Sequence, residues 1–310
     1  MLSFNKGDKN RCLANLADSK GKTKEIYMKE TFNKSLPPEI DSTPEMKAKI
    51  FQEFLDLQKK LSTDDLKILE KAYMNDQSLE NPKLRNILKD GKAFVQDSLK
   101  YYLSFPESID VLPNFKNDEA YAVYLSGASG AGKSYLISQL ISKHLPPREA
   151  GVFYLGPFAD DVSFKSIAKH MIPVDLDQFH KEERREIEIE DFPEGSVIIF
   201  DDIESLPNSK QVEALRDRIL SVFRHHKFKL YCVNHVGMAG NKTKKLLLEC
   251  KYLVVYPSAN YKQVERMLTT YMGLDKQKCL LIKNQPSRWV CLCKAFPSYF
   301  ISQHSVGILN

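Results

Sequence analysis

The fold of this chain is decided by one stretch, Gly127-Ala128-Ser129-Gly130-Ala131-Gly132-Lys133-Ser134, which has the form G-x-x-x-x-G-K-S. The apolar run 121–125 before it is typical of a strand. The run 135–144 after it has apolar residues at helical spacing. A strand, a glycine-rich loop and a helix in this order predict a phosphate-binding loop.

Each residue type in this loop contributes to phosphate binding in a different way. Glycines let backbone N–H groups turn toward phosphate oxygens, and the positive end of the following helix adds to their attraction. We expect Lys133 to reach the β- and γ-phosphates of a nucleotide, and the Ser134 hydroxyl to occupy one position on Mg²⁺. The residues expected to contact the nucleotide are Gly127, Ala128, Ser129, Gly130, Ala131, Gly132, Lys133, Ser134 and Tyr135.

A second motif spans residues 196–204, where an apolar strand ends in two adjacent acids. This is the Walker B form, and it supplies the metal partner that a phosphate-binding loop needs while the terminal phosphate bond breaks. We assign Asp201 to Mg²⁺, through water and the Ser134 hydroxyl. Asp202 is the candidate for orienting or activating the attacking water, and Glu204 is the alternative for that role.

A third motif is the apolar strand 229–234, which ends in Asn234 and His235. An amide or an imidazole at this strand tip can hydrogen-bond a phosphate oxygen and the attacking water together. Either residue fits the role of a γ-phosphate sensor, and a plain turn is the alternative interpretation. Arg224 precedes this strand and is a candidate for acting in trans on a neighbouring subunit, whereas Arg216 and Arg218 are expected on a solvated helix face.

Composition bounds the class of protein. The chain has 310 residues, of which 43% are hydrophobic and 27% charged, with a net charge of +5. These values are ordinary for a globular protein, and no apolar run is long enough to predict a membrane span. The N-terminal residues lack the apolar core of a secretory signal. The six cysteines form no C-x-x-C pair, which favours free thiols in a reducing, intracellular compartment.

The pattern along the chain predicts three regions. Residues 1–44 are rich in Lys, Asn and Ser and predict a flexible basic arm. Residues 45–115 have helical spacing and helix-start signals. Residues 116–310 predict an α/β phosphate-binding-loop domain that ends in a β-hairpin, formed by segments 287–294 and 299–302. Predicted strands are 121–126, 152–156, 196–201, 229–234 and 252–256; predicted helices are 133–144, 161–170, 208–224, 241–250 and 260–272.

Strands that alternate with helices in this way predict a mostly parallel sheet with helices on both faces. After the third strand motif, residues 237–245 predict an exposed basic loop. Its lysines, Lys242, Lys244 and Lys245, are candidates for gripping a phosphate backbone.

The order of these motifs resembles that of the FtsK-HerA type of RecA-like P-loop ATPases. More narrowly, it resembles the genome-packaging ATPases of large DNA viruses, the poxvirus and giant-virus kind, over residues 118–260. The resemblance implies a ring of subunits that hydrolyses ATP with Mg²⁺ and threads double-stranded DNA into a preformed capsid. It also implies a capsid or portal-type partner, a location in the host cytoplasm or virus factory, and association with the virion.

Two other functions stay open at this stage. One is a different nucleic-acid motor, such as a helicase or a transposon-associated ATPase, with the same Walker chemistry. The other is a switch or scaffold that binds ATP and recruits partners through its N-terminal helices. The acids that follow the strand 197–200 favour hydrolysis over binding alone.

Overall fold

The computed structural model describes residues 2–6, 10–28, 44–56, 58, 61–116, 118–176, 187–257 and 261–309. The chain separates into two compact units. Unit 1 comprises Met1–Val111 and His304–Ile308, and unit 2 comprises Leu112–Gln303 and Leu309–Asn310.

Unit 1 contains a small sheet and a group of helices. The sheet has the order β1-β3-β2-β5 and consists of β1 (Leu2–Ser3), β3 (Thr23–Met28), β2 (Arg11–Asp18) and β5 (Ile109–Pro113), of which β5 continues into the first residues of unit 2. The strand β4 (Tyr102–Ser104) pairs antiparallel with β14 (Ser305–Ile308), which comes from the other end of the chain.

The flexible arm predicted for residues 1–44 is wrong for the part of it that the structure describes. β2 and β3 form an antiparallel hairpin in which Leu13 and Ile26 are fully buried. At the turn, the Asp18 carboxylate accepts the N–H groups of Lys20 and Lys22 at 2.9 and 2.8 Å. A few buried apolar side chains are enough to hold such a hairpin, and the low apolar content of the segment gave no sign of them. Residues 29–43 lie outside the described residues.

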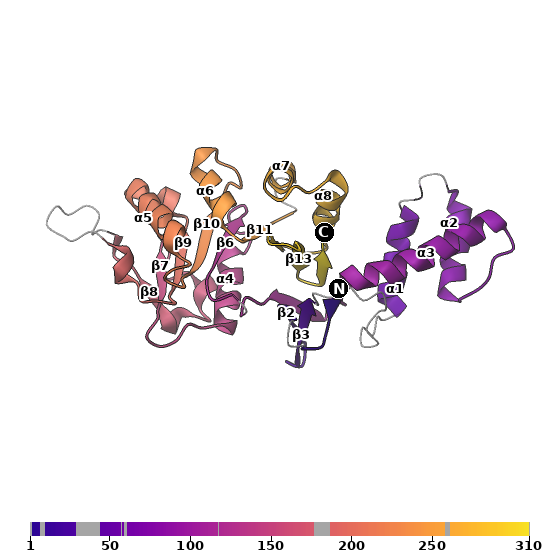
Figure 1. Ribbon diagram of the computed structural model, residues 1–310, viewed down its shortest axis with the longest axis horizontal. Helices are drawn as coiled ribbons and strands as arrows, with labels where there is room; N and C mark the ends of the chain where they lie inside the picture. Colours follow the sequence, from indigo (N-terminus) through magenta and orange to yellow (C-terminus); the bar gives the residue numbers. More distant parts are fainter. Residues whose placement is uncertain are drawn as a thin grey trace. The chain divides into compact units, whose positions relative to one another are not determined.

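The helices predicted for residues 45–115 are present up to Tyr101, and β4 and β5 follow them. They are α1 (Pro44–Asp56), α2 (Thr63–Met74) and α3 (Pro82–Tyr101), and Figure 1 shows α1 and α2 against α3. The Phe51 and Tyr73 rings stack with centroids 3.9 Å apart. The Ser62 hydroxyl caps α2 by accepting the Asp65 N–H at 3.1 Å.

Unit 2 is built on a mostly parallel sheet, as predicted. The strand order is β13-β12-β11-β6-β10-β9-β7-β8. The strands from β11 to β8 are parallel, and β12 and β13 form the predicted antiparallel hairpin. Their bounds are β6 (Tyr121–Ser126), β7 (Val152–Leu155), β8 (Met171–Pro173), β9 (Val197–Asp201), β10 (Lys229–Asn234), β11 (Tyr252–Val255), β12 (Val290–Cys293) and β13 (Tyr299–Ser302).

Helices connect these strands and lie around the sheet (Figure 1). They are α4 (Lys133–Lys143), α5 (Ser209–Val222), α6 (Asn241–Glu249), α7 (Tyr261–Met272) and α8 (Lys276–Lys283). The fold class is therefore α/β.

Two predictions for unit 2 are wrong. The helix predicted for residues 161–170 is instead two short 3₁₀ turns, Val162–Phe164 and Ala168–His170, and strand β8 begins directly after them. The exposed basic loop predicted for 237–245 is wrong from Asn241 onward, where the helix predicted for 241–250 is present as α6. Within α6, the Lys245 ammonium donates to the Asp217 carbonyl oxygen at 2.6 Å and to the Ser221 hydroxyl at 2.8 Å.

The parallel arrangement brings the three sequence motifs to one edge of the sheet. In the register, Asn234 at the end of β10 pairs with Ser126 at the end of β6, and Val233 pairs with Asp201 at the end of β9. The glycine-rich loop, the acid pair and the Asn234–His235 tip therefore leave the sheet side by side, because parallel strands end at the same edge.

Two chain-wide features complete the fold. All six cysteines are buried free thiols. None of the described helices has the length and apolar character needed to cross a bilayer.

Candidate nucleotide-binding site

The glycine-rich loop joins β6 to α4, with Lys133, Ser134 and Tyr135 in the first turn of the helix. Gly132 has φ +94°, in the left-handed region that favours glycine, and open space surrounds the position of a Cβ atom there. Gly127 serves a different purpose. A Cβ atom on it would lie 2.6 Å from the Tyr256 ring, so only glycine allows the loop to lie this close to the end of β11.

The Lys133 side chain lies inside this loop, with 6% of its surface exposed. Its ammonium donates to the carbonyl oxygens of Gly127 and Ala128 at 2.8 and 3.1 Å, and lies 3.3 Å from Nδ1 of His235. Burial lowers its pKa, and the Asp202 carboxylate opposes that shift. The same loop residues and His235 border a cavity of about 180 Å³.

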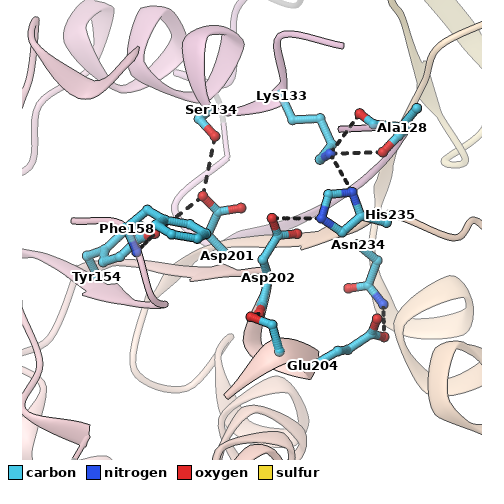
Figure 2. Close-up of polar contacts among 12 residues, drawn as sticks. Ala128, Lys133, Ser134, Tyr154, Phe158, Asp201, Asp202, Glu204, Asn234 and His235 are labelled. Carbon is cyan, nitrogen blue, oxygen red and sulfur yellow. Dashed lines mark hydrogen bonds and ion pairs between the residues drawn. The ribbon is translucent and has the colours of Figure 1, made fainter. Parts of the chain in front are cut away.

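His235 links the lysine to one of the two acids (Figure 2). Its Nε2 lies 2.8 Å from Oδ2 of Asp202. Because the Lys133 ammonium can only donate, Nδ1 must accept, and the Nε2 hydrogen is then free to be donated to Asp202. These contacts fit the neutral imidazole with its hydrogen on Nε2.

Asp202 has two features that set it apart from an ordinary loop acid. Its backbone has φ +48°, a left-handed conformation that is unusual for a residue other than glycine. Its Oδ1 is buried and has no hydrogen-bond partner among the described residues. An acceptor in this position is suited to receive a hydrogen bond from a water molecule.

Asp201 faces the other side of the loop, toward Ser134. Its Oδ2 accepts the Ser134 hydroxyl at 3.3 Å and the Tyr154 hydroxyl at 3.4 Å. The side chain is buried, and burial followed by the Asp202 charge raises the pKa of Asp201 to about 6. A cation beside this carboxylate would stabilise its charged form.

The donor set at Ser134 and Asp201 fits Mg²⁺, which prefers oxygen ligands and keeps several waters or phosphate oxygens. No group of three or more His, Cys, Asp or Glu side chains within the described ranges could hold a metal by itself. Ser134 and Asp201 would therefore hold the ion jointly with phosphate oxygens and water.

The two sensor candidates point to different partners. His235 contacts Lys133 and Asp202, as described above, whereas the Asn234 amide donates to Glu204 Oε1 at 2.9 Å. Glu204 is thus held by the strand tip and not by the lysine or the Asp201–Ser134 pair (Figure 2).

The arginines do not join this group. Arg224 is 68% exposed, and its guanidinium lies 3.8 Å from the Glu249 carboxylate. The solvated helix face predicted for Arg216 is wrong, because this side chain is 3% exposed and donates to Asp217 at 2.9 and 3.0 Å. Neither arginine contacts the phosphate-binding loop.

Sequence reasoning missed Tyr154 and Gly156, which lie next to Asp201. Tyr154 belongs to the predicted strand 152–156. The only local sign of a role at the site is a hydroxyl-bearing ring within an apolar run. Its partner is distant in the chain, so no spacing rule indicates the contact.

The whole chain was compared with protein families, known proteins and solved structures. No protein-family model matches the chain. In sequence the chain is similar to the uncharacterised protein V3 of Sputnik virophage, with 23% identity over 248 residues that cover 77% of this chain and 90% of the relative.

Among solved structures, the chain is similar to the genome packaging NTPase B204 of Sulfolobus turreted icosahedral virus 2 in complex with AMP. The TM-score is 0.39 and the identity 12%, covering 62% of this chain and 98% of that one. It is also similar to the cytoplasmic domain of the Type VII secretion ATPase EccC of Thermomonospora curvata. That match has a TM-score of 0.42 and 14% identity, covering 60% of this chain and 26% of that one.

One neighbour is thus a viral genome packaging NTPase, the kind of protein that the sequence motifs resemble.

Proposed function

We propose that this chain is a Mg²⁺-dependent ATPase. The observation that carries the proposal is the meeting of Lys133, Ser134, Asp201 and Asp202 at one sheet edge, where one Asp202 oxygen is buried without a partner among the described residues. A phosphate-binding loop facing two acids of unequal environment is the arrangement that phosphoryl transfer to water requires.

In the proposed reaction, a water oxygen attacks the γ-phosphorus and the bond to the β–γ bridging oxygen breaks, which yields ADP and phosphate. Lys133 leaves the carbonyl oxygens of Gly127 and Ala128 and donates to the β- and γ-phosphates, while the loop N–H groups bind the remaining oxygens. Asp202 accepts a hydrogen bond from the attacking water and takes its proton as the new P–O bond forms, and this proton then passes to the released phosphate or to solvent. Mg²⁺, held by Ser134 and Asp201, would neutralise charge on the phosphate oxygens.

We assign the sensor role to His235, because it contacts both the phosphate-binding lysine and the proposed catalytic acid. Asn234 then has the separate task of holding Glu204, the alternative catalytic acid. Arg224 is exposed and remains the candidate for acting on a neighbouring subunit's site.

We further propose that the chain works as a ring on double-stranded DNA and moves a viral genome into a capsid. The support is the motif order, the virophage relative and the viral packaging NTPase among the structural neighbours. The proposal includes a capsid or portal-type partner and a reducing, intracellular location, which agrees with six free buried thiols. It includes no membrane.

The test is ATP hydrolysis by the purified protein with and without double-stranded DNA, together with its mass in solution with ATP. A motor should assemble into a closed oligomer, and DNA should raise its rate. A helicase or transposon-associated ATPase would instead respond to single-stranded or specific DNA. Nucleotide binding by a protein that stays monomeric, with a rate unaffected by DNA, would favour the switch or scaffold.

A further inference from the structure

A buried tyrosine lies beside the acid that we assign to Mg²⁺. Tyr154 is on β7, next to β9, and is 1% exposed. Its ring packs edge-to-face against Phe164, with centroids 5.4 Å apart. Since packing fixes the ring, the hydroxyl group has a defined position.

Two hydrogen bonds meet at this hydroxyl (Figure 2). The Phe158 backbone N–H donates to it at 3.3 Å, which leaves the hydroxyl hydrogen to be donated to Asp201 Oδ2 at 3.4 Å. The Ser134 hydroxyl donates to the same Oδ2 at 3.3 Å. Both contacts hold the carboxylate in one orientation without using Oδ1.

The loop that supplies the Phe158 N–H approaches Asp201 closely because of a glycine. A Cβ atom on Gly156 would lie 2.4 Å from the Asp201 carbonyl oxygen and 2.7 Å from the Tyr154 hydroxyl. Contacts this short do not occur, so any side chain at position 156 would push the loop away from the acid.

We infer that Tyr154 is a positioning residue for the metal: its hydroxyl holds the Asp201 carboxylate in the orientation that binds Mg²⁺, and ties it to the loop 156–164. The inference rests on the proposed function, which names Asp201 as the Mg²⁺ ligand. The role differs from that of Asp202, because Tyr154 acts only through Asp201.

The test compares Tyr154→Phe with Tyr231→Phe. The first keeps the ring and its contact with Phe164 and removes only the hydroxyl. The second removes an equally buried hydroxyl that contacts Tyr121 at 2.9 Å. Two quantities are measured. The first is the Mg²⁺ concentration at which half of the Mg²⁺-dependent gain in affinity for a non-hydrolysable ATP analogue is reached. The second is the hydrogen exchange rate of the Phe158 amide without nucleotide.

We expect Tyr154→Phe to need about threefold to tenfold more Mg²⁺, with unchanged affinity for the analogue in the absence of metal. The Phe158 amide should exchange faster, because it loses its acceptor. Tyr231→Phe should keep wild-type values in both measurements. Gly156→Ala is a second variant that keeps the Tyr154 side chain but presses on its hydroxyl, and it should raise the Mg²⁺ requirement in the same direction.

An unchanged Mg²⁺ requirement in both Tyr154→Phe and Gly156→Ala would overturn the inference, as would a wild-type protein whose analogue affinity does not respond to Mg²⁺. The proposed function fails separately, if the wild-type protein binds the analogue with Mg²⁺ but never hydrolyses ATP. The binding readout still decides the role of Tyr154 in that case.

Discussion

Asp201 and Asp202 are neighbours in sequence, but their carboxylates have different surroundings. Asp201 is hydrogen-bonded by two hydroxyl groups, from Ser134 and Tyr154. Asp202 contacts the His235 ring through one oxygen, and its other oxygen has no partner in the part of the chain that the structure describes. The backbone at Asp202 is left-handed, with φ +48°. Two adjacent acids can therefore carry two different tasks.

The two acids should separate in mutagenesis. Asp202→Asn should still bind ATP with Mg²⁺ but hydrolyse it about 10²-fold to 10⁴-fold more slowly, because the water loses its acceptor. Asp201→Asn should instead lose the Mg²⁺-dependent part of ATP binding. Binding titrations and single-turnover hydrolysis measure the two effects. If Asp201→Asn loses hydrolysis and Asp202→Asn loses Mg²⁺-dependent binding, the metal ligand and the catalytic acid are exchanged. If Glu204→Gln binds ATP but does not hydrolyse it, Glu204 is the catalytic acid.

The raised pKa of Asp201 predicts a pH dependence of stability. The pKa of an Asp in the unfolded chain is about 4, whereas the pKa of Asp201 in the folded protein is about 6. Between these values the folded protein holds a proton that the unfolded chain releases. This contribution to stability is complete below about pH 4 and is lost as the pH rises through about 6. In metal-free protein, the ionised Asp201 is therefore unfavourable at neutral pH.

Asp201→Asn should accordingly stabilise the metal-free protein by up to about 3 kcal/mol at about pH 8, and by nothing at about pH 4. Thermal or urea unfolding of both proteins at the two pH values measures this difference. Saturating Mg²⁺ and ATP should reverse it at the higher pH, because the bound cation favours the charged carboxylate. A difference that is the same at both pH values would contradict the assignment.

At the scale of single elements, the glycine-rich loop is held against the end of β11. Gly127→Ala should press on the Tyr256 ring, cost about 1–3 kcal/mol and weaken nucleotide binding. A second substitution, Tyr256→Leu, should restore much of that binding by making room. Gly130→Ala is the matched control: its Cβ meets no atom within 4 Å, and φ is +73°. Gly130→Ala should lose nucleotide binding through backbone strain, so Tyr256→Leu should not restore binding in that variant. Equal rescue of both glycine variants by Tyr256→Leu would refute the packing explanation.

The elements that the sequence could predict are those with local signals. The loop 127–134 and the strands around it follow from glycine positions and apolar runs, and they appear at nearly the predicted bounds. The hairpin of β2 and β3, the contact of Tyr154 with Asp201 and the choice between Asn234 and His235 depend on residues far apart in the chain. Local propensity carries no information about such pairs.

At the scale of the whole molecule, the proposed motor predicts DNA binding governed by phosphate contacts. The logarithm of the binding constant should fall linearly with the logarithm of salt concentration, by about 0.9 per phosphate contacted. Replacing Lys242 and Lys244, at the start of α6, with alanine should lower that slope by about 1 to 2 and leave basal ATP hydrolysis unchanged. Lys245 is left intact, because it bonds to α5.

The control for that variant is the alanine replacement of Lys83 and Lys89, two exposed lysines on α3 that change the net charge equally. Fluorescence anisotropy with double-stranded DNA at several salt concentrations measures both slopes. Identical slopes in the two double variants would exclude the start of α6 as a DNA contact.

The central claim is that the chain hydrolyses ATP bound at the phosphate-binding loop, with Lys133 donating to the phosphates. Phosphate release by Lys133→Ala tests this claim most directly. Lys143→Ala, which removes an exposed lysine from the last turn of the same helix, is the control. With Mg²⁺ and ATP, the wild-type protein and Lys143→Ala should release phosphate at equal rates. Lys133→Ala should release none above background, because no other cation contacts the loop carbonyl oxygens that now hold its ammonium, among the residues described. Wild-type turnover in a folded Lys133→Ala protein would contradict the account.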